Sequence, residues 1–336
     1  MRGVWRGALV LSVAAGFGIR AQQPQQPQQA PVFKSSTQTV PVYVTVLDDG
    51  HLVTDLKKDD FEIFDNGRQQ PITLFDSSIQ PISIVIMLDT SGSMVGNIAL
   101  LRTSAVQMFT RLLPADKARL GYFGNQIALS PKFTNNQDEL IRWLWSELDA
   151  GGPTPLWAAV NVAMTTLSHF EGRRVVLILS DGKDTGTVRA FGRPGPPPVM
   201  FQDVVYRAQS EDFMVYAIGL ASKGSGYGNM GAVYGAYFGK ALGKDEPDPG
   251  LRTIAEDSGG GYFEINENTA LGPAFARVAD ELHRQYLLGY VVPESDGKPH
   301  TVTVRVTKPG LQVRARRSYV APRRSSQNDA PALEAR

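Results

Sequence analysis

The sequence predicts an α/β protein: a doubly wound, mostly parallel sheet with helices on both faces, inserted in a small antiparallel β-sandwich built from both chain ends. Two nearly continuous apolar runs, 82–88 and 174–180, are typical of strands buried on both faces, as in a parallel sheet covered by helices. Near both chain ends, valines alternate with other residues, as expected for antiparallel strands with one buried face.

The first apolar run leads into a short polar loop and then into a helix. It ends at Asp89, and the small residues Ser91, Gly92 and Ser93 follow. Apolar residues then recur with helical spacing, at Ile98, Leu101, Ala105, Met108 and Leu112. The loop therefore lies at the carboxyl end of a strand and the positive end of a helix, where α/β sheets usually carry their sites.

The chemistry of this loop favours a hard divalent cation. Asp89, Ser91 and Ser93 present oxygen atoms at alternate positions, with no sulfur or imidazole ligand nearby. Oxygen-only ligand shells suit Mg²⁺, Ca²⁺ or Mn²⁺. Serine is also a good helix cap, so the same residues could serve only to begin the following helix. The loop alone does not decide between a metal site and a helix cap.

Two later stretches carry further oxygen ligands. A Gly-Gly-Pro turn leads through Thr154 into an apolar helix, and the second buried strand ends in Ser-Asp181-Gly. With Asp89, Ser91 and Ser93, these residues resemble the von Willebrand factor type A (VWA) family, with its DxSxS motif, separate threonine and strand-end aspartate. The resemblance covers roughly residues 81–285, and all five motif positions are present in order. The stretches DDFEIFDNG before it and YLLGY after it resemble a bacterial exported subgroup of the family.

The resemblance implies a metal-ion-dependent adhesion site. In such a site Ser91, Ser93 and Thr154 bind the ion through their hydroxyls, and Asp89 and Asp181 act mostly through water. The expected ion is Mg²⁺, with Mn²⁺ or Ca²⁺ as alternatives. Because the direct ligands are neutral, the cation remains strongly electrophilic, and a carboxylate from a protein partner can fill its open coordination position.

The first residues have the features of an export signal. Arg2 and Arg6 precede an apolar segment at 8–19, and Ala21 offers a small residue for cleavage after 1–21. The apolar segment is short for a membrane span, and an uncleaved signal, the alternative, would be the one membrane contact. We therefore expect an exported protein, located in the periplasm, at the cell surface or outside the cell. The Gln/Pro tract 22–31 predicts a disordered linker.

Residues 32–80 and 286–320 are predicted to be the two parts of the β-sandwich, with the VWA domain at 81–285 between them and a disordered tail at 321–336. Turn signals separate alternating strands at Asp48-Asp49-Gly50, Asp65-Asn66-Gly67 and Pro309-Gly310. Neither part has enough strands to be stable alone, so we expect them to pair. Their connections to the VWA domain are short, which predicts that the β-sandwich lies near the end of the sheet opposite the metal.

Within the VWA domain, further strands are expected at 119–123, 127–133, 214–220 and 261–265, and helices at 137–148, 156–169, 202–209 and 269–284. Two inserts interrupt this pattern, at 185–199 and 222–244. Tyr227, Tyr234 and Tyr237 in the second insert offer a rim for contact with a partner. Low-complexity disorder of this insert is the alternative.

Composition narrows the function. With 34 Lys and Arg against 33 Asp and Glu, the chain has no charge excess for binding nucleic acid. It contains no cysteine, which excludes disulfides and thiolate metal sites. The four histidines are scattered without a nucleophile motif, and no second loop matches that of Asp89 as an aspartic protease would require. We therefore expect a protein that is not an enzyme.

The predicted function is that of an exported adhesion or protein-interaction module that binds an acidic partner group through its metal. The alternatives are a metal-dependent hydrolase and a scaffold whose metal only stabilises the fold. A cluster of arginines is predicted to form a solvated strand face and tail: Arg314, Arg316, Arg317, Arg323 and Arg324. Binding of an anionic envelope polymer is a minor alternative. Partner identity and oligomeric state do not follow from the sequence.

The last helix of the VWA domain runs into the β-sandwich with essentially no linker. This raises the hypothesis that occupancy of the metal site alters how the β-sandwich is held, which would require different contacts in two states. The alternative is a rigid pair, in which the short connections only fix the orientation.

Overall fold

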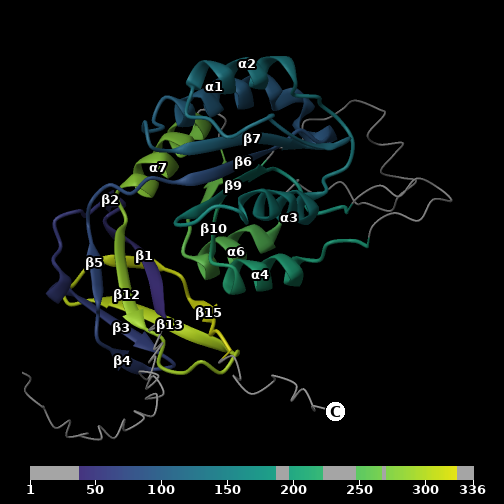
Figure 1. The fold of residues 1–336 in the computed structure, drawn as a ribbon. Coiled ribbons are helices and arrows are strands. Elements are labelled where there is room, and N and C mark those ends of the chain that lie inside the picture. Colours follow the sequence, from purple (N-terminus) through teal and green to yellow (C-terminus); the bar gives the residue numbers. More distant parts are fainter. Residues whose placement is uncertain (1–37, 187–196, 222–246, 267–269, 324–336) are drawn as a thin grey trace, which may run out of the picture. The chain divides into compact units, whose positions relative to one another are not determined.

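The first apolar run forms a central strand of a six-stranded sheet in the computed structural model, which describes residues 38–186, 197–221, 247–266 and 270–323 (Figure 1). In spatial order the strands are β11 (Tyr262–Ile265), β10 (Phe213–Leu220), β9 (Arg174–Ser180), β6 (Ser83–Asp89), β7 (Lys117–Phe123) and β8 (Ile127–Leu129). Neighbouring strands run parallel except β7 and β8, which are antiparallel. The predicted mostly parallel sheet is confirmed.

Helices cover both faces of this sheet. One face carries α1 (Ile98–Phe109), α2 (Gln137–Ser146) and α7 (Leu271–His283), and the other carries α3 (Leu156–Leu167), α4 (Phe201–Ser210) and α6 (Pro249–Ser258) (Figure 1). Strand β6 shows why its apolar run is continuous. Ile84, Ile86 and Leu88 pack with the first group of helices, and Val85 and Met87 with the second. The predicted doubly wound arrangement is confirmed.

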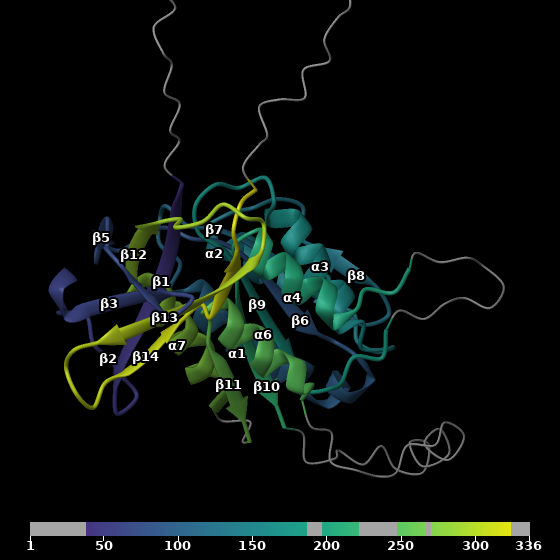
Figure 2. The ribbon, with the colours of Figure 1, turned by 90° about the horizontal axis from the view of Figure 1, so that it is seen from below.

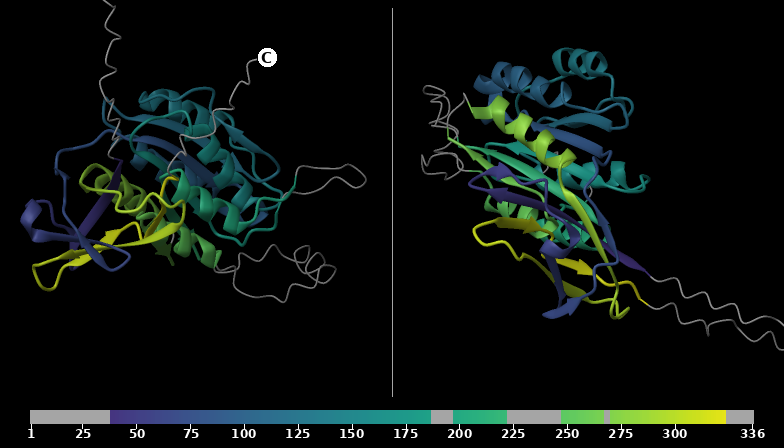
Figure 3. Two further views of the ribbon diagram at one scale, coloured as in Figure 1. Left: turned by 60° about the horizontal axis from the view of Figure 1, so that its bottom comes forward. Right: turned by 90° about the vertical axis from the view of Figure 1, so that its left-hand side faces the viewer.

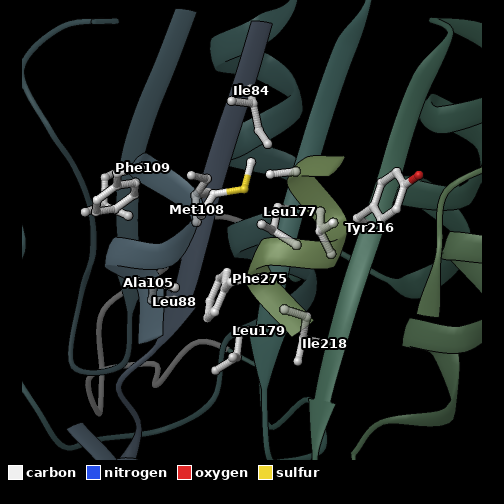
Figure 4. Packing of buried hydrophobic residues seen from close by; sticks show 14 of the residues in the cluster. Ile84, Leu88, Ala105, Met108, Phe109, Leu177, Leu179, Tyr216, Ile218 and Phe275 are labelled. Atoms are coloured by element: carbon white, nitrogen blue, oxygen red, sulfur yellow. The ribbon is translucent and has the colours of Figure 1, made fainter. Parts of the chain in front are cut away.

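The core beneath α1 and α7 is tightly packed. Figure 4 shows Met108 and Phe109 of α1 and Phe275 of α7 gathered over strand residues that include Leu88 and Leu179. All five side chains are fully buried. Burial of a side chain of this size stabilises the fold by about 1.5–3 kcal/mol. Leu88 and Leu179 lie one residue before the ends of β6 and β9, so this core packs directly beneath the carboxyl edge of the sheet.

Both chain ends contribute strands to two further sheets, which are antiparallel throughout (Figure 2). The first contains β14 (Gln312–Ala315), β1 (Thr39–Asp48), β12 (Tyr286–Val291) and β5 (Leu74–Asp76), with β2 (His51–Leu52) paired to β1. The second contains β15 (Ser318–Val320), β13 (Pro299–Val306), β3 (Phe61–Asp65) and β4 (Arg68–Gln70). β1 pairs with β12 and β3 pairs with β13, so strands from the two ends of the chain pair as predicted.

Two local features differ from the elements predicted above. Helix α6 was not among them, although its ends carry clear signals. The Asp248 carboxylate accepts a hydrogen bond from the Gly250 N–H, Pro249 begins the helix, and Gly259 ends it with φ of +83°. Strand β8 ends at Leu129, four residues before the predicted end at Phe133.

The helix-covered sheet and the β-sandwich meet at a group of polar side chains, all buried except the half-buried Arg314. We call this group the joint: Thr45, Arg173, Tyr216, Glu281, Gln285 and Arg314. Helix α7 runs directly into β12 beside it (Figure 3). The Arg173 guanidinium donates to the carbonyl of Leu282 and to the side-chain oxygen of Gln285. Gln285 in turn donates to Thr45 Oγ1 over 2.6 Å. Arg173 directly precedes β9, so the joint lies at the amino ends of the strands.

The arginines near the C-terminus are not all solvated, so that prediction was wrong for two of them. Arg314 forms an ion pair with Glu281, which is fully buried in α7, and Arg316 pairs with Asp212. Arg317 does remain largely exposed. The partners of Arg314 and Arg316 lie 33 and 104 positions away in the chain, so both ion pairs depend on the tertiary fold.

A second buried polar contact fixes the end of α7. His283 Nε2 lies 2.8 Å from Asp116 Oδ2, and Asp116 also accepts from the N–H groups of Ile82 and Leu113.

In the described part of the chain, the helices are too short or too polar to cross a membrane.

Candidate metal centre

The five predicted ligands come from three loops that meet at one edge of the six-stranded sheet. Asp89 ends β6, and Ser91 and Ser93 follow it at the start of the 3-10 helix η2 (Gly92–Asn97). Thr154 precedes α3, and Asp181 directly follows β9. β6 and β9 are adjacent and parallel, so their carboxyl ends bring Asp89 and Asp181 to the same edge.

Hydrogen bonds connect four of these residues in a row. Asp89 Oδ1 accepts from the Ser91 N–H over 2.8 Å, and the hydroxyl oxygens of Ser91 and Ser93 lie 3.2 Å apart. Ser93 Oγ then donates to Asp181 Oδ1 over 2.7 Å. The position of Thr154 follows from Gly182, since a β-carbon built there would lie 3.5 Å from Thr154 Oγ1 and 4.0 Å from Ser93 Oγ. The structure therefore brings all five side chains together.

The two serines do not act as helix caps. Ser91 occupies the N-cap position of η2 without a side-chain capping bond, and Asn97 precedes α1 in the same way. The hydroxyls of Ser91 and Ser93 instead face each other, and that of Ser93 also faces Asp181. The capping role left open by the sequence is not what these side chains do here.

Backbone contacts hold the neighbouring loops at fixed distances. The Gly92 N–H donates to the Gly152 carbonyl over 3.0 Å, and the Gly151 N–H donates to the Thr90 carbonyl over 2.7 Å. A β-carbon at Gly124 would lie only 2.6 Å from the Gly151 carbonyl oxygen, so this close approach requires glycine. The site is thus preorganised by main-chain packing.

Asp89 is a fully buried carboxylate with neutral hydrogen-bond donors. Burial raises its pKa, while hydrogen bonds from Ser180 and Ser91 act in the opposite direction and leave the pKa above its usual range. Among the described residues, no Lys, Arg or His lies within ion-pair distance of Asp89. A cation supplied from outside the chain would stabilise the charged form of this group.

Three residues that contribute to the site were not predicted. Ser180 donates from its hydroxyl to Asp89 Oδ2, and Thr185 Oγ1 accepts from the Thr154 N–H over 2.8 Å. Asp184 Oδ1 accepts from the Trp157 N–H at the start of α3. The polar run from Ser180 to Thr185 at the end of a buried strand was the available signal.

Two further points concern the predicted partner rim and other possible metal sites. Tyr227, Tyr234 and Tyr237, the predicted partner rim, lie outside the described residues. Within the described ranges, no group of three or more His, Cys, Asp or Glu side chains could hold a metal ion. A site built on Asp89 and Asp181 therefore depends on the three hydroxyls for its other protein ligands.

Comparison with known proteins identifies the family. A family model, the von Willebrand factor type A domain, matches residues 83–276, and a search of curated proteins found no match. Similar solved structures include the vWF domain of the type V pili tip protein Mfa5 from Porphyromonas gingivalis, with 12% identity, coverage of 60% of this chain and 95% of that chain, and a TM-score of 0.44.

Two further structures are similar at the same level. One is a von Willebrand factor type A protein from Catenulispora acidiphila, with 12% identity, coverage of 86% and 76%, and a TM-score of 0.45. The other is the PilB minor pilin from Streptococcus sanguinis, with 17% identity, coverage of 65% and 64%, and a TM-score of 0.42. Similarity this low transfers no function. The family match spans more than half of the 336 residues, and the chain belongs to the von Willebrand factor type A domain family.

Proposed function

We propose that this chain is an exported, non-enzymatic protein-interaction module that binds a protein partner through a divalent cation. Asp89, Ser91, Ser93, Thr154 and Asp181 would hold the ion, with Mg²⁺ as the first candidate and Mn²⁺ or Ca²⁺ as alternatives. The observation that carries this proposal is the orientation of the two serine hydroxyls. The two hydroxyls face each other, and that of Ser93 also faces Asp181. In a helix-capping role they would instead have faced backbone N–H groups.

The donor set fits a hard cation. It consists of two carboxylates and three hydroxyls, and oxygen ligands of this kind suit Mg²⁺, Mn²⁺ and Ca²⁺. Gly182 carries no side chain beside the hydroxyls of Thr154 and Ser93, which leaves space next to both. A cation would also compensate the burial of Asp89, for which the described chain supplies only neutral donors.

The residues of the chain orient the donors, and the bound ion would supply a Lewis-acidic position for a partner carboxylate. Ser180 and the Ser91 N–H fix the Asp89 carboxylate from two sides. Gly92, Gly151 and Gly152 connect the serine loop to the threonine loop through backbone hydrogen bonds. Because these contacts are made within the chain, they would hold the oxygen donors in place for the ion.

Other features support the interaction role. Membership of the VWA family is consistent with a binding module. No histidine of the described chain forms a hydrogen bond to any of the five side chains, and two of the four pair with Asp116 and Asp65 instead. The signal-like residues 1–21 support export to the periplasm, the cell surface or the medium, and the tyrosines of the second insert remain candidates for partner contact.

Titration calorimetry tests the metal step directly. We expect the purified protein to bind Mg²⁺ or Mn²⁺ with one site, and Asp89→Ala to bind neither. The proposal would be refuted if the wild-type protein bound none of Mg²⁺, Mn²⁺ and Ca²⁺.

The partner step is tested by pull-down from an envelope extract of the source cells, with wild type and Asp89→Ala compared in Mg²⁺ and in chelator. A partner retained only by wild type in Mg²⁺ supports adhesion. Divalent-dependent turnover of a peptide, ester or phosphate substrate, abolished by Asp89→Ala, would favour a hydrolase instead.

A further inference from the structure

The loop that follows β9 does more than supply Asp181. Thr185, four residues later, pairs with Thr154 in both directions. Thr185 Oγ1 accepts from the Thr154 N–H over 2.8 Å, and the Thr185 N–H donates to the Thr154 carbonyl over 3.0 Å. The position of the Thr154 main chain therefore depends on a residue 31 positions away.

The same loop is held at two other points. Asp184 Oδ1 accepts from the Trp157 N–H over 3.3 Å, which fastens the loop to the first turn of α3. Asp248, the N-cap of α6, accepts from the Asp184 N–H over 3.1 Å and donates from its own N–H to the Gly182 carbonyl over 3.2 Å. The loop is thus braced between the amino ends of α3 and α6, and Thr185 has a fixed position from which to hold Thr154.

We propose that Thr185 is a positioning residue for the metal site: its hydroxyl sets the place of Thr154, so that one loop contributes Asp181 and also aligns a ligand from a second loop. This inference rests on the proposed metal function. Thr185 itself is exposed, and its hydroxyl accepts from the Thr154 main chain. Its role is therefore to orient Thr154, and the effect of removing it should appear in metal affinity more than in fold stability.

The test compares Thr185→Val with Thr185→Ser and with wild type. Valine has nearly the shape of threonine but no acceptor for the Thr154 N–H, whereas serine keeps the acceptor. Loss of a residue that orients a metal ligand typically weakens metal affinity about 10–100-fold. We expect Thr185→Val to bind Mn²⁺ about 10–100-fold more weakly in titration calorimetry, and Thr185→Ser to bind within about threefold of wild type.

Two further measurements separate positioning from a general loss of structure. The melting temperature in chelator should fall by only about 2–4 °C in Thr185→Val, as expected for one lost hydrogen bond. It should be unchanged in the control Thr253→Val, whose exposed hydroxyl bonds only within α6 among the described contacts. In Thr185→Val the Thr154 amide should also lose protection from hydrogen exchange without metal, because its acceptor is gone.

The outcomes are distinct. Mn²⁺ affinity of Thr185→Val equal to that of wild type would overturn the positioning role and leave the metal function standing. Equal weakening by Thr253→Val, or a fall of the chelator melting temperature that matches the loss of affinity, would also overturn it. Failure of the wild-type protein to bind Mn²⁺ would refute the proposed function and the positioning role together.

Discussion

Each end of the six-stranded sheet buries an ionisable side chain, Arg173 at one end and Asp89 at the other, but the groups that surround the two side chains differ. At the amino ends of the strands, the Arg173 guanidinium is buried in the joint and donates to the Leu282 carbonyl and the Gln285 side chain, with its central carbon 4.7 Å from the Tyr43 ring centroid. At the carboxyl ends, Asp89 is buried among hydroxyl and amide donors. The chain's own acceptors and an aromatic ring surround the cation of the joint, whereas the charged form of Asp89 would be stabilised by a cation from outside the chain.

This difference separates stability from binding. Arg173 holds the end of α7 and Gln285, which lies just before β12, so removing it should weaken the fold. Asp89 belongs to the candidate metal centre, so under the proposed function its removal should change what the protein binds. The hypothesis that metal occupancy alters how the β-sandwich is held would require movement at the end of α7. Arg173 and Glu281 hold this end within the joint, and His283 holds it through Asp116. These contacts favour the rigid pair that was the alternative.

The largest expected effect comes from Arg173→Met. Methionine fills part of the volume but leaves the Leu282 carbonyl and the Gln285 amide oxygen buried without their donor, which should lower the free energy of unfolding by about 2–4 kcal/mol. Urea unfolding of Arg173→Met is compared with Arg142→Met, an exposed position in α2 where the change should be within about 0.5 kcal/mol. If the two substitutions lowered the free energy of unfolding equally, the contacts of Arg173 in the joint would not be a particular source of stability.

The Mn²⁺ affinity of folded Arg173→Met provides a second test of the difference between the two ends of the sheet. This affinity should equal that of wild type, because the joint and the candidate metal centre lie at opposite ends of β9. A large loss of affinity without unfolding would show instead that the two ends are coupled.

The next effect is that of Asp89→Asn. In chelator, this variant should unfold within about 1 kcal/mol of wild type or be slightly more stable, because it removes a buried charge and keeps groups that can hydrogen-bond to Ser91 and Ser180. Mg²⁺ at 100 times its dissociation constant should stabilise wild type by about 2.7 kcal/mol and leave the variant unchanged. Mg²⁺ stabilisation of the variant equal to that of wild type would contradict the role of Asp89.

The smallest effect concerns Asp116 and its dependence on pH. Burial raises the pKa of Asp116, but hydrogen bonds from His283, Leu113 and Ile82 outweigh this and leave the pKa below its ordinary value. A carboxyl with a lowered folded pKa contributes stability above its unfolded pKa of about 3.9, and this contribution is lost as the pH falls through the folded pKa.

Asp116→Asn should therefore cost about 1–2 kcal/mol at pH 7 and progressively less as the pH falls below about 4. Urea unfolding at a series of pH values between 3 and 7 measures the difference from wild type. A difference that stays constant across this range would show that the ionised form of Asp116 is not what stabilises α7.

Much of the fold could be predicted because local patterns specify it. The continuous apolar runs of β6 and β9 indicate strands buried on both faces, and Asn66 and Gly67 adopt φ of +48° and +79°, as their hairpin signal requires. Helix α6 was missed because it is short and begins a few residues after the second insert. Its signals were the caps at Asp248 and Gly259 and the helical spacing of Leu251, Ile254 and Ala255.

The candidate site could be predicted only in part, for a different reason. Asp89, Ser91 and Ser93 lie close together in the chain, and the family's order of residues pointed to Thr154 and Asp181. Ser180 acts through a hydrogen bond to Asp89, which is 91 positions away, and Thr185 through one from Thr154, which is 31 positions away. The ion pair of Arg314 likewise depends on Glu281, which lies in the earlier helix α7. Such pairings arise from the packing of loops and sheets and leave no periodic pattern in the sequence.

The most direct test of a metal centre built from these loops is a crystal structure of the protein grown with Mn²⁺, with anomalous diffraction data. We predict one anomalous peak among Asp89, Ser91, Ser93, Thr154 and Asp181, with the three hydroxyl oxygens at roughly 2 Å, the coordination distance of a small divalent cation. The peak should be absent from crystals of Asp89→Ala. A well-ordered loop at 89–93 without a peak, or a peak that lies elsewhere on the protein, would contradict the account.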